Sequence, residues 1–285
     1  MPEAEKNLQP IGVFDSGIGG LTVVKELMQA VPLERIVYFG DTARVPYGSK
    51  SVETVQRYAR EDTELLLSHD VKMIVVACNT VSATAMEEVR RAANGLPVVG
   101  MIEPCARSAV HVTKNGKIGV IGTEATIASK AYDVALQLEG KAQSKPIETF
   151  SVACPLFVPL AEEGWTEHEA TTLIAAEYLL RLKQQGVDTL ILGCTHYPVL
   201  EEVIQRVMGP DVRLMNSGAI AAREVATTLQ KIEAEQDAPE HLMLVSDVPR
   251  KFRTIGERFL GRELPEVRQV VFKESWVIRR EPVVL

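Results

Sequence analysis

Two of the four cysteines lie in matching local sequences that favour acid–base or nucleophilic chemistry. Cys78 stands between an apolar run and the polar pair Asn79-Thr80, and Cys194 stands between a second apolar run and Thr195-His196. Each run has the length and composition of a buried strand, and each polar pair is typical of a helix start. Backbone N–H groups and the helix dipole stabilise a thiolate there. The pattern therefore predicts two reactive thiols, although a lone free cysteine is more often a small buried hydrophobe.

Racemisation is the reaction that two opposed thiols suit best. One sulfur, as thiolate, removes the α-proton of an amino acid while the other, as thiol, delivers a proton to the opposite face. General acid–base catalysis contributes roughly 10²–10⁴-fold per group, so donors near the substrate carboxylate must supply much of the rest. We expect these donors from Asn79, Thr80 and Thr195, and we expect Asp15 and His196 to assist the thiols or pair with the ammonium.

An internal repeat supports this pairing of the cysteines. Residues 71–80 align on residues 187–196 without a gap, and residues 11–16 align on residues 118–123. Each polar residue in these segments is also a common helix cap. Their concentration at corresponding strand ends nevertheless favours a binding site shared by two related units.

The fold class follows from apolar β-branched runs that alternate with amphipathic helical stretches. Continuous apolar strands between helices are typical of parallel sheets covered on both faces. The expected strands are 11–14, 35–39, 72–77, 97–101, 117–121, 147–153, 189–193 and 212–215. We predict an α/β protein made of two pseudo-symmetric, flavodoxin-like domains with parallel sheets.

One helix has a clear start signal. Thr166 is followed three residues later by Glu169, which is the spacing of a capping box. The signal predicts a helix with Leu173, Ile174, Leu179 and Leu180 on its inward face.

The segment after residue 211 has no counterpart in the repeat. It carries strand signals at 242–245 and 267–272 and a helix signal at 249–260. We expect it to complete the first sheet, which predicts a discontinuous first domain (1–100 plus 211–285) and an inserted second domain (101–210). Ligands bind at the carboxyl ends of strands in open parallel sheets, so the active site is expected in the cleft between the domains.

Composition excludes several classes of protein. A chain of 285 residues that is 46% hydrophobic and 24% charged is typical of a globular protein. The net charge of −7 and the absence of a Lys/Arg block argue against nucleic acid as a partner. The polar, acidic residues 1–10 and the lack of a long apolar run predict no signal peptide and no membrane span. With no C-x-x-C motif, the cysteines are expected to be reduced thiols of a cytoplasmic enzyme.

Five motifs, taken together and in order, closely resemble the glutamate racemase family. They are residues 15–21, residues 40–42 with 46–48, residues 77–80, residues 154–155 with 159–164, and residues 192–198. The resemblance extends from about residue 11 to residue 217. It implies interconversion of L- and D-glutamate, which supplies D-glutamate for peptidoglycan, with neither pyridoxal phosphate nor a metal, and hence no cofactor. A homodimer is expected.

The resemblance also implies roles for individual residues. The cysteine that matches Cys78 acts on the D-enantiomer, and the one that matches Cys194 acts on the L-enantiomer. Asp15 and His196 would support the thiols. The residues implied to hold the side-chain carboxylate are Ser16 with the backbone of Tyr47 and Gly48, and those implied to hold the α-carboxylate are Asn79, Thr80 and Thr195.

One acidic residue of the family site has two adjacent candidates in this sequence. Glu162 matches it by position within the segment 159–164. The adjacent Glu163 is an alternative. Glu162 is the residue that we assign to the catalytic group.

A dinucleotide-binding domain is the main rival from another class. Gly17-x-Gly19 follows the first expected strand, and Asp41 ends the second, where a ribose-binding acid would lie. Thr22 replaces the third glycine, and Asp15 would repel a pyrophosphate. This interpretation also leaves both cysteines without a role.

Three further alternatives remain open. Cys78, Cys194 and His196 are enough ligands for a catalytic zinc, although their spacing does not require one. A related aspartate racemase would use the same two-thiol chemistry. It would differ in the depth of its pocket, which the sequence does not give. A binding protein for an acidic amino acid would share the cleft, but not the need for two cysteines.

Overall fold

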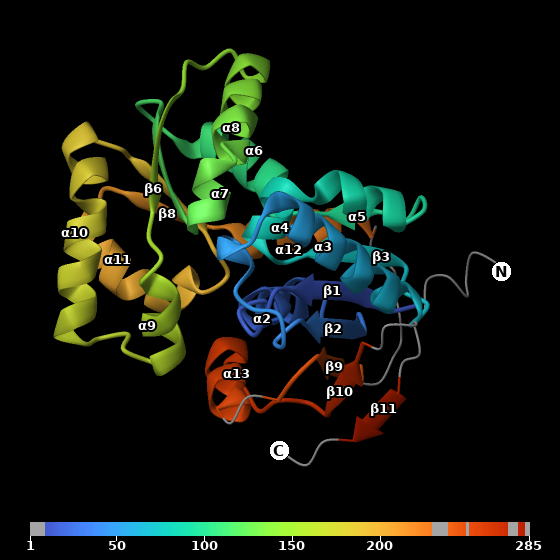
Figure 1. Ribbon diagram of the computed structural model, residues 1–285. Helices are drawn as coiled ribbons and strands as arrows, with labels where there is room; N and C mark the ends of the chain where they lie inside the picture. The colour runs from blue at the N-terminus through green and yellow to red at the C-terminus, as the bar shows by residue number, and fades with distance from the viewer. Residues whose placement is uncertain (1–8, 230–238, 249–250, 273–278, 283–285) are drawn as a thin grey trace.

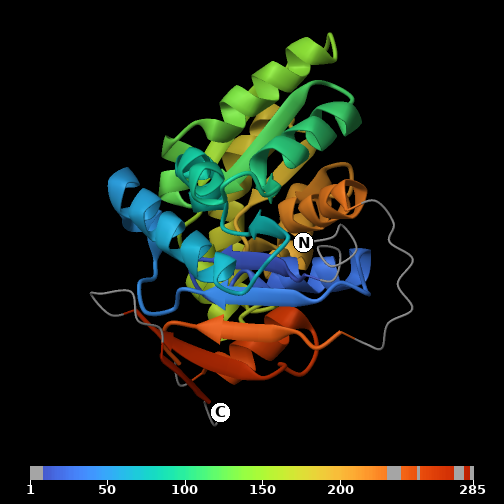
Figure 2. The same cartoon turned by 90° about the vertical axis from the view of Figure 1, so that its right-hand side faces the viewer.

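The computed structural model describes residues 9–229, 239–248 and 251–272, together with the backbone of residues 279–282. These described residues form two sheets. The larger has the strand order β11-β10-β9-β2-β1-β3-β4, and the smaller has the order β6-β5-β7-β8. The smaller unit lies to the upper left of the larger one in Figure 1 and above it in Figure 2. The predicted α/β class with two sheets is confirmed.

Among the described strands, all pairs are parallel except that of β10 with β11, which is antiparallel and was not predicted. The larger sheet contains β1 (Ile11–Asp15), β2 (Ile36–Gly40), β3 (Met73–Val76), β4 (Val98–Val99), β9 (Leu242–Val245), β10 (Val267–Val271) and β11 (Arg279–Pro282). The smaller sheet contains β5 (Lys117–Gly122), β6 (Glu148–Ala153), β7 (Thr189–Gly193) and β8 (Arg213–Asn216).

Helices follow most of the strands, as a parallel sheet requires. Those of the larger unit are α2 (Leu21–Ala30), α3 (Val52–Leu67), α4 (Asn79–Thr84), α5 (Met86–Ala92), α12 (Ser217–Thr228) and α13 (Phe252–Leu260), with the 3₁₀ helix η1 (Tyr47–Ser49). Those of the smaller unit are α6 (Ile102–Val112), α7 (Glu124–Ala128), α8 (Ala131–Ala142), α9 (Phe157–Glu163), α10 (Glu169–Gln185) and α11 (Glu201–Met208), with the 3₁₀ helix η2 (Tyr197–Leu200). The first two residues of the expected helix 249–260 lie outside the described residues. In the part of the chain that is described, no helix is both long and apolar enough to cross a bilayer.

The internal repeat appears as a repeated topology. The order β2-β1-β3-β4 in the larger sheet corresponds to β6-β5-β7-β8 in the smaller one. Cys78 comes two residues after β3, and Cys194 directly follows β7. The two cysteines therefore occupy equivalent places, each beyond the carboxyl end of the third strand of its unit.

The strand β8 departs from the expected domain boundary. It pairs in parallel with β7, so residues 213–216 belong to the smaller sheet and not to the first domain. The following helix, α12, packs against α2 of the larger unit. The chain thus returns to the first unit after residue 216, because β8 takes the same place beside β7 that β4 takes beside β3.

The predicted capping box at the start of α10 was wrong, and the predicted inward face was right for Leu179 and for the partly buried Ile174 only. The helix begins at Glu169, and the ring of His168 accepts a hydrogen bond from Ala170 N. Thr171 Oγ1 donates to the carbonyl of Trp165 instead, which keeps the preceding segment in a turn. The buried face consists of Thr171, Ala175, Leu179 and Leu182, whereas Leu173 and Leu180 are 64% and 52% exposed.

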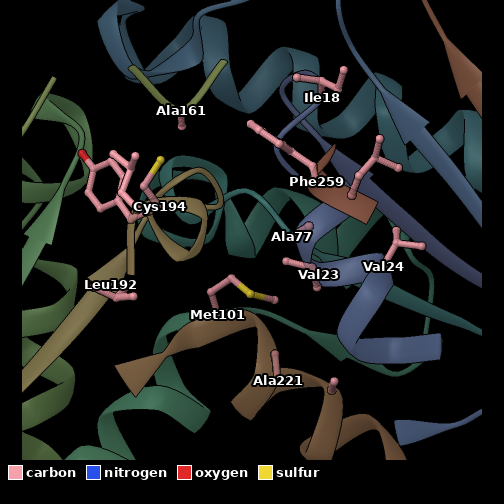
Figure 3. Close-up of a cluster of buried hydrophobic side chains, with 14 of the residues drawn as sticks. Ile18, Val23, Val24, Ala77, Met101, Ala161, Leu192, Cys194, Ala221 and Phe259 are labelled. Carbon is pink, nitrogen blue, oxygen red and sulfur yellow. The ribbon is translucent and has the colours of Figure 1, made fainter. Parts of the chain in front are cut away.

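One of the buried apolar clusters in the described residues contains side chains of both units. Ile18, Val23 and Val24 of the larger unit belong to the same buried cluster as Leu192 and Cys194 of the smaller one (Figure 3). Burying an aliphatic side chain contributes roughly 1.5–3 kcal/mol, so this shared core holds the two strand ends at a fixed separation.

Asp188 ties the loop before β5 to the start of β7. Its carboxylate accepts hydrogen bonds from Thr113 Oγ1 at 2.6 Å and from the backbone of Lys114 and Asn115 at 2.7 Å. Burial alone would raise the pKa of Asp188, but these bonds outweigh it and lower the pKa below its ordinary value. The Asp188 carboxylate therefore stabilises the fold fully at pH values above its pKa in the unfolded chain. This contribution is lost as the pH falls through its lower pKa in the folded protein.

Asp188→Ala is expected to lower the free energy of unfolding by about 2 kcal/mol at neutral pH, because several charge-assisted bonds are lost. The deficit should shrink as the pH approaches 3. Urea unfolding at several pH values measures both effects. Asp211→Ala, an exposed matched control, should change stability by less than about 0.5 kcal/mol, and an equal loss in both variants would refute the assignment.

Candidate active site

A cavity of about 270 Å³ opens at the carboxyl ends of the strands, between the two units. Both Cys78 and Cys194 line it. Of the residues expected from the sequence, the lining contains Ser16, Tyr47, Gly48, Cys78, Asn79, Thr80, Glu162, Cys194, Thr195 and His196. Asp15 is the exception, since it lies beneath the lining and is only 1% exposed. The structure thus brings all but one of these residues to one cavity.

The glycines after β1 are explained by close packing and not by a phosphate. A Cβ atom at Gly19 would clash with Thr195 Oγ1 and with the ring of His196. A Cβ atom at Gly20 would lie 2.5 Å from the Cβ of Asp15. These two glycines therefore let the first loop of the larger unit reach the cysteine segment of the smaller one.

Cys78 is a buried thiol in contact with Ser16. Its Sγ donates to Ser16 Oγ over 3.6 Å, and it directly precedes α4. Burial and the negative charge of Asp15 raise the pKa of Cys78 to about 12, although the backbone N–H of Val81 acts in the opposite direction. The helix start does favour the thiolate, as expected, but desolvation is the larger effect. Cys78 is therefore protonated near neutral pH.

Cys194 has a different partner. His196 Nδ1 lies 3.9 Å from its sulfur, and His196 Nε2 lies 3.0 Å from Glu162 Oε1. Burial alone would lower the pKa of His196, but these contacts with Cys194 and Glu162 outweigh it and raise the pKa to about 10. An imidazolium beside a sulfur favours the thiolate form of that sulfur. The two cysteines thus have opposite electrostatic surroundings.

The choice between the two adjacent glutamates follows from these contacts. Glu162 lines the cavity and bonds to His196. Glu163 faces away and pairs with Lys251 at 2.8 Å. Glu162 is therefore the one with access to the site.

Asp15 supports the site from below. Its Oδ2 accepts hydrogen bonds from Gly17 N at 3.1 Å and Gly20 N at 3.0 Å. Its Oδ1 has no hydrogen-bond partner among the described residues. Burial raises the pKa of Asp15, while the nearby His196 lowers it. Its charge therefore acts on both His196 and Cys78 without contact with the cavity.

The side chain of Asn79 is already engaged within the protein. Its Nδ2 donates to Ser217 Oγ at 3.4 Å, and its Oδ1 accepts from Tyr132 OH at 2.7 Å. Asn79 can therefore offer a carboxylate its backbone N–H, at the start of α4, and the second hydrogen of its side-chain amide.

A group of three threonine hydroxyls was only partly foreseen. Thr80 Oγ1 lies 3.0 Å from Thr123 Oγ1 and 3.3 Å from Thr126 Oγ1. Thr123 lines the cavity, yet it was not among the expected site residues. The signal was present, because the internal repeat aligns Thr123 with Ser16. Equivalent hydroxyls therefore lie at the ends of β1 and β5.

Metal ligation finds no support in the described part of the chain. No group of three or more His, Cys, Asp or Glu side chains there is arranged to hold an ion. The nitrogen of His196 that faces away from Cys194 is bonded to Glu162. The arrangement offers proton donors and acceptors.

Glu162→Gln is expected to lower the pKa of His196, because its partner Glu162 loses the charge that helps to raise it. The alkaline limb of the kcat/KM profile should then move to lower pH. Glu163→Gln is the matched control, because it makes the same change at the next residue of the chain, which faces away from the cavity. It should leave the alkaline limb in place. An unmoved limb in Glu162→Gln would show that the contact does not tune His196.

The fold and the cavity define a class: paired α/β units that each contribute one cysteine to a shared cleft. A profile of the family described as Asp/Glu/Hydantoin racemase matches residues 11–225. The chain belongs to this family.

Individual relatives narrow the comparison. The chain is 53% identical to a glutamate racemase from Chlorobaculum tepidum over 92% of this chain and 96% of the relative. The crystal structure of a glutamate racemase from Francisella tularensis in complex with D-glutamate has a TM-score of 0.85 at 38% identity, covering 95% of this chain and all of the other. A glutamate racemase isoform from Bacillus anthracis has a TM-score of 0.85 at 40% identity, covering 93% of this chain and 98% of the other.

Proposed function

We propose that this chain is a glutamate racemase, which interconverts L- and D-glutamate with two cysteine bases and no cofactor, and supplies D-glutamate for peptidoglycan. The observation that supports it most is that Cys78 and Cys194 line one cavity from equivalent strand ends of two related units.

The opposite surroundings of the two sulfurs set the order of proton transfer. When L-glutamate is the substrate, Cys194 is the thiolate that removes the α-proton, because the His196 imidazolium stabilises the negative charge of this sulfur. Cys78 carries a proton at rest and delivers it to the other face of the same carbon. The products are D-glutamate, a Cys194 thiol and a Cys78 thiolate. Proton exchange with water restores the starting state, and D-glutamate reacts by the reverse sequence.

The remaining cavity residues hold the two carboxylates of the substrate. The α4 N-terminus with Thr80, and Thr195 on the opposite unit, offer donors to the α-carboxylate. Ser16 and the backbone of Tyr47 and Gly48 form the subsite for the side-chain carboxylate. Hydrogen bonds that strengthen as charge develops on the α-carboxylate stabilise the carbanion-like transition state.

The wider setting follows from the same proposal. The enzyme is cytoplasmic, where reducing conditions keep its four free cysteines as thiols. Its domains are residues 1–100 with 217–285, and residues 101–216, a division that the pairing of β8 supports. It forms a homodimer, and the exposed apolar side chains Leu173 and Leu180 on α10 are surface that a second copy would cover.

Circular-dichroism polarimetry with each enantiomer of glutamate and of aspartate, without added cofactor, tests the function. Both glutamate enantiomers should approach the same optically inactive mixture, and a chelator should not slow the reaction. Turnover of aspartate in preference to glutamate would replace the proposed substrate. Inactivity that pyridoxal phosphate or zinc reverses would refute the two-thiol mechanism.

A further inference from the structure

Arg44 lies at the centre of a buried cluster of charges below one wall of the cavity. Its guanidinium makes ion pairs with Asp41, Glu61 and Asp62, and the pair with Asp62 Oδ1 measures 2.9 Å. Asp41 and Asp62 have completely buried side chains. The guanidinium also lies 4.1 Å from the ring centre of Tyr58, which is within cation–π distance. Arg44 is therefore fixed from several sides.

The segment that follows Arg44 leads directly into the cavity wall. Residues 45–49 all line the cavity. Tyr47 points the other way, and its hydroxyl bonds to Asp41 and, at 3.0 Å, to Asp62 Oδ2. The same two carboxylates thus hold Arg44 at one end of the segment and Tyr47 near its middle. The backbone of Tyr47 and Gly48 can move only if this cluster opens.

The cluster has more acids than bases. Three carboxylates surround one guanidinium, while Ser246 Oγ donates to Asp41 Oδ1 at 2.7 Å. Burial and the Asp41 charge raise the pKa of Asp62 well above its ordinary value, although Arg44 opposes this. Without the guanidinium, Asp41 and Asp62 would lose the cation that holds both carboxylates, and the pKa of Asp62 would rise further, because Arg44 is the charge that opposes its rise. A buried charge that loses its partner is strongly destabilising, so the local structure must then rearrange.

We infer that Arg44 is a positioning residue for substrate binding, which acts by drawing Asp41 and Asp62 together beneath residues 45–49. This role deepens the proposed function, because the backbone it fixes is the proposed subsite for the side-chain carboxylate. Arg44 does not itself line the cavity. Its loss reduces the fraction of molecules with a formed subsite, and apparent affinity falls by that fraction.

Arg44→Met tests this role, because the proposal predicts an effect on KM and little effect on kcat. The variant keeps the apolar stem but removes the guanidinium. KM for both glutamate enantiomers should rise about tenfold if the subsite is formed about one tenth of the time. Changes in kcat should stay within about threefold, because the sulfurs are untouched and uniform binding affects KM alone. Arg44→Lys keeps the charge without the planar fork and should raise KM less.

The matched control is Arg60→Met, on the same helix as two of the acids. Arg60 is half exposed and its only ion pair, with Glu64, measures 3.9 Å in the described part of the chain. Its KM should equal that of the wild type. If Arg44→Met does not fold, Arg44→Lys carries the comparison. A wild-type KM in a folded Arg44 variant, or a fall in kcat with no change in KM, would overturn the inference.

Hydrogen exchange separates this inference from the proposed function. Without substrate, the peptide that contains residues 44–49 should exchange faster in Arg44→Met or Arg44→Lys than in the wild type and in Arg60→Met. Faster exchange in a protein that does not racemise glutamate would support the positioning role and refute the function. Unchanged exchange in both Arg44 variants would overturn the positioning role, whatever the substrate.

Discussion

Cys78→Ala and Cys194→Ala are each expected to lower racemisation of glutamate by at least about a thousandfold, because each removes a base in one direction and an acid in the other. Each change to alanine removes one sulfur atom that borders the cavity, so it creates no new enclosed void and should leave the fold intact. The two enantiomers have equal free energies, so the equilibrium constant is one. The kcat/KM values in the two directions must therefore fall equally in every variant.

Isotope exchange reveals what each variant retains. In Cys78→Ala, Cys194 can still remove and return the α-proton of L-glutamate, so L-glutamate should gain deuterium from D₂O without racemising. Cys194→Ala should show the same for D-glutamate. Cys105→Ala is the control, because this cysteine is buried away from the cavity. Racemisation at wild-type rate in either cavity variant would remove that sulfur from the mechanism.

Asp15→Asn is expected to lower kcat/KM by roughly tenfold to a hundredfold, which corresponds to about 1.4–2.7 kcal/mol of lost transition-state stabilisation. The amide oxygen can accept the same bonds from Gly17 and Gly20, so the loop should keep its shape. What disappears is the negative charge that raises the pKa of Cys78 and favours the His196 imidazolium. The Cys78 thiolate then becomes a weaker base.

Asp188→Asn is the matched control for this charge effect. It makes the same chemical change just before β7, at the opposite end of that strand from Cys194. Its kcat/KM should match the wild type, and the pH profile of Asp15→Asn should differ from both. An Asp15→Asn enzyme with normal kinetics would show that the buried charge has no part in proton transfer.

Much of the site could be predicted because it follows strand ends. The residues after β3 and β7 are fixed by local sequence, and the repeat showed that Cys78 and Cys194 occupy equivalent places. In an open parallel sheet such positions meet at one edge. Local sequence and topology were therefore enough to place both sulfurs at one cavity.

Features that depend on packing could not be predicted. The pKa of Cys78 reflects desolvation by residues far apart in the chain, and its helix start alone pointed the other way. The inward face of α10 is set by which side meets the smaller sheet, so Leu173 and Leu180 were misplaced. The sequence contained no sign of the Arg44 cluster, because Glu61 and Asp62 come close to Arg44 only when α3 packs beside β2.

The first turnovers in D₂O test most directly whether two sulfurs flank one carbon. The account predicts that D-glutamate formed from L-glutamate carries deuterium at the α-carbon, while recovered L-glutamate still carries protium, and that the reverse reaction shows the mirror pattern. Equal labelling of product and recovered substrate from the start would mean that one base serves both faces, and would contradict it.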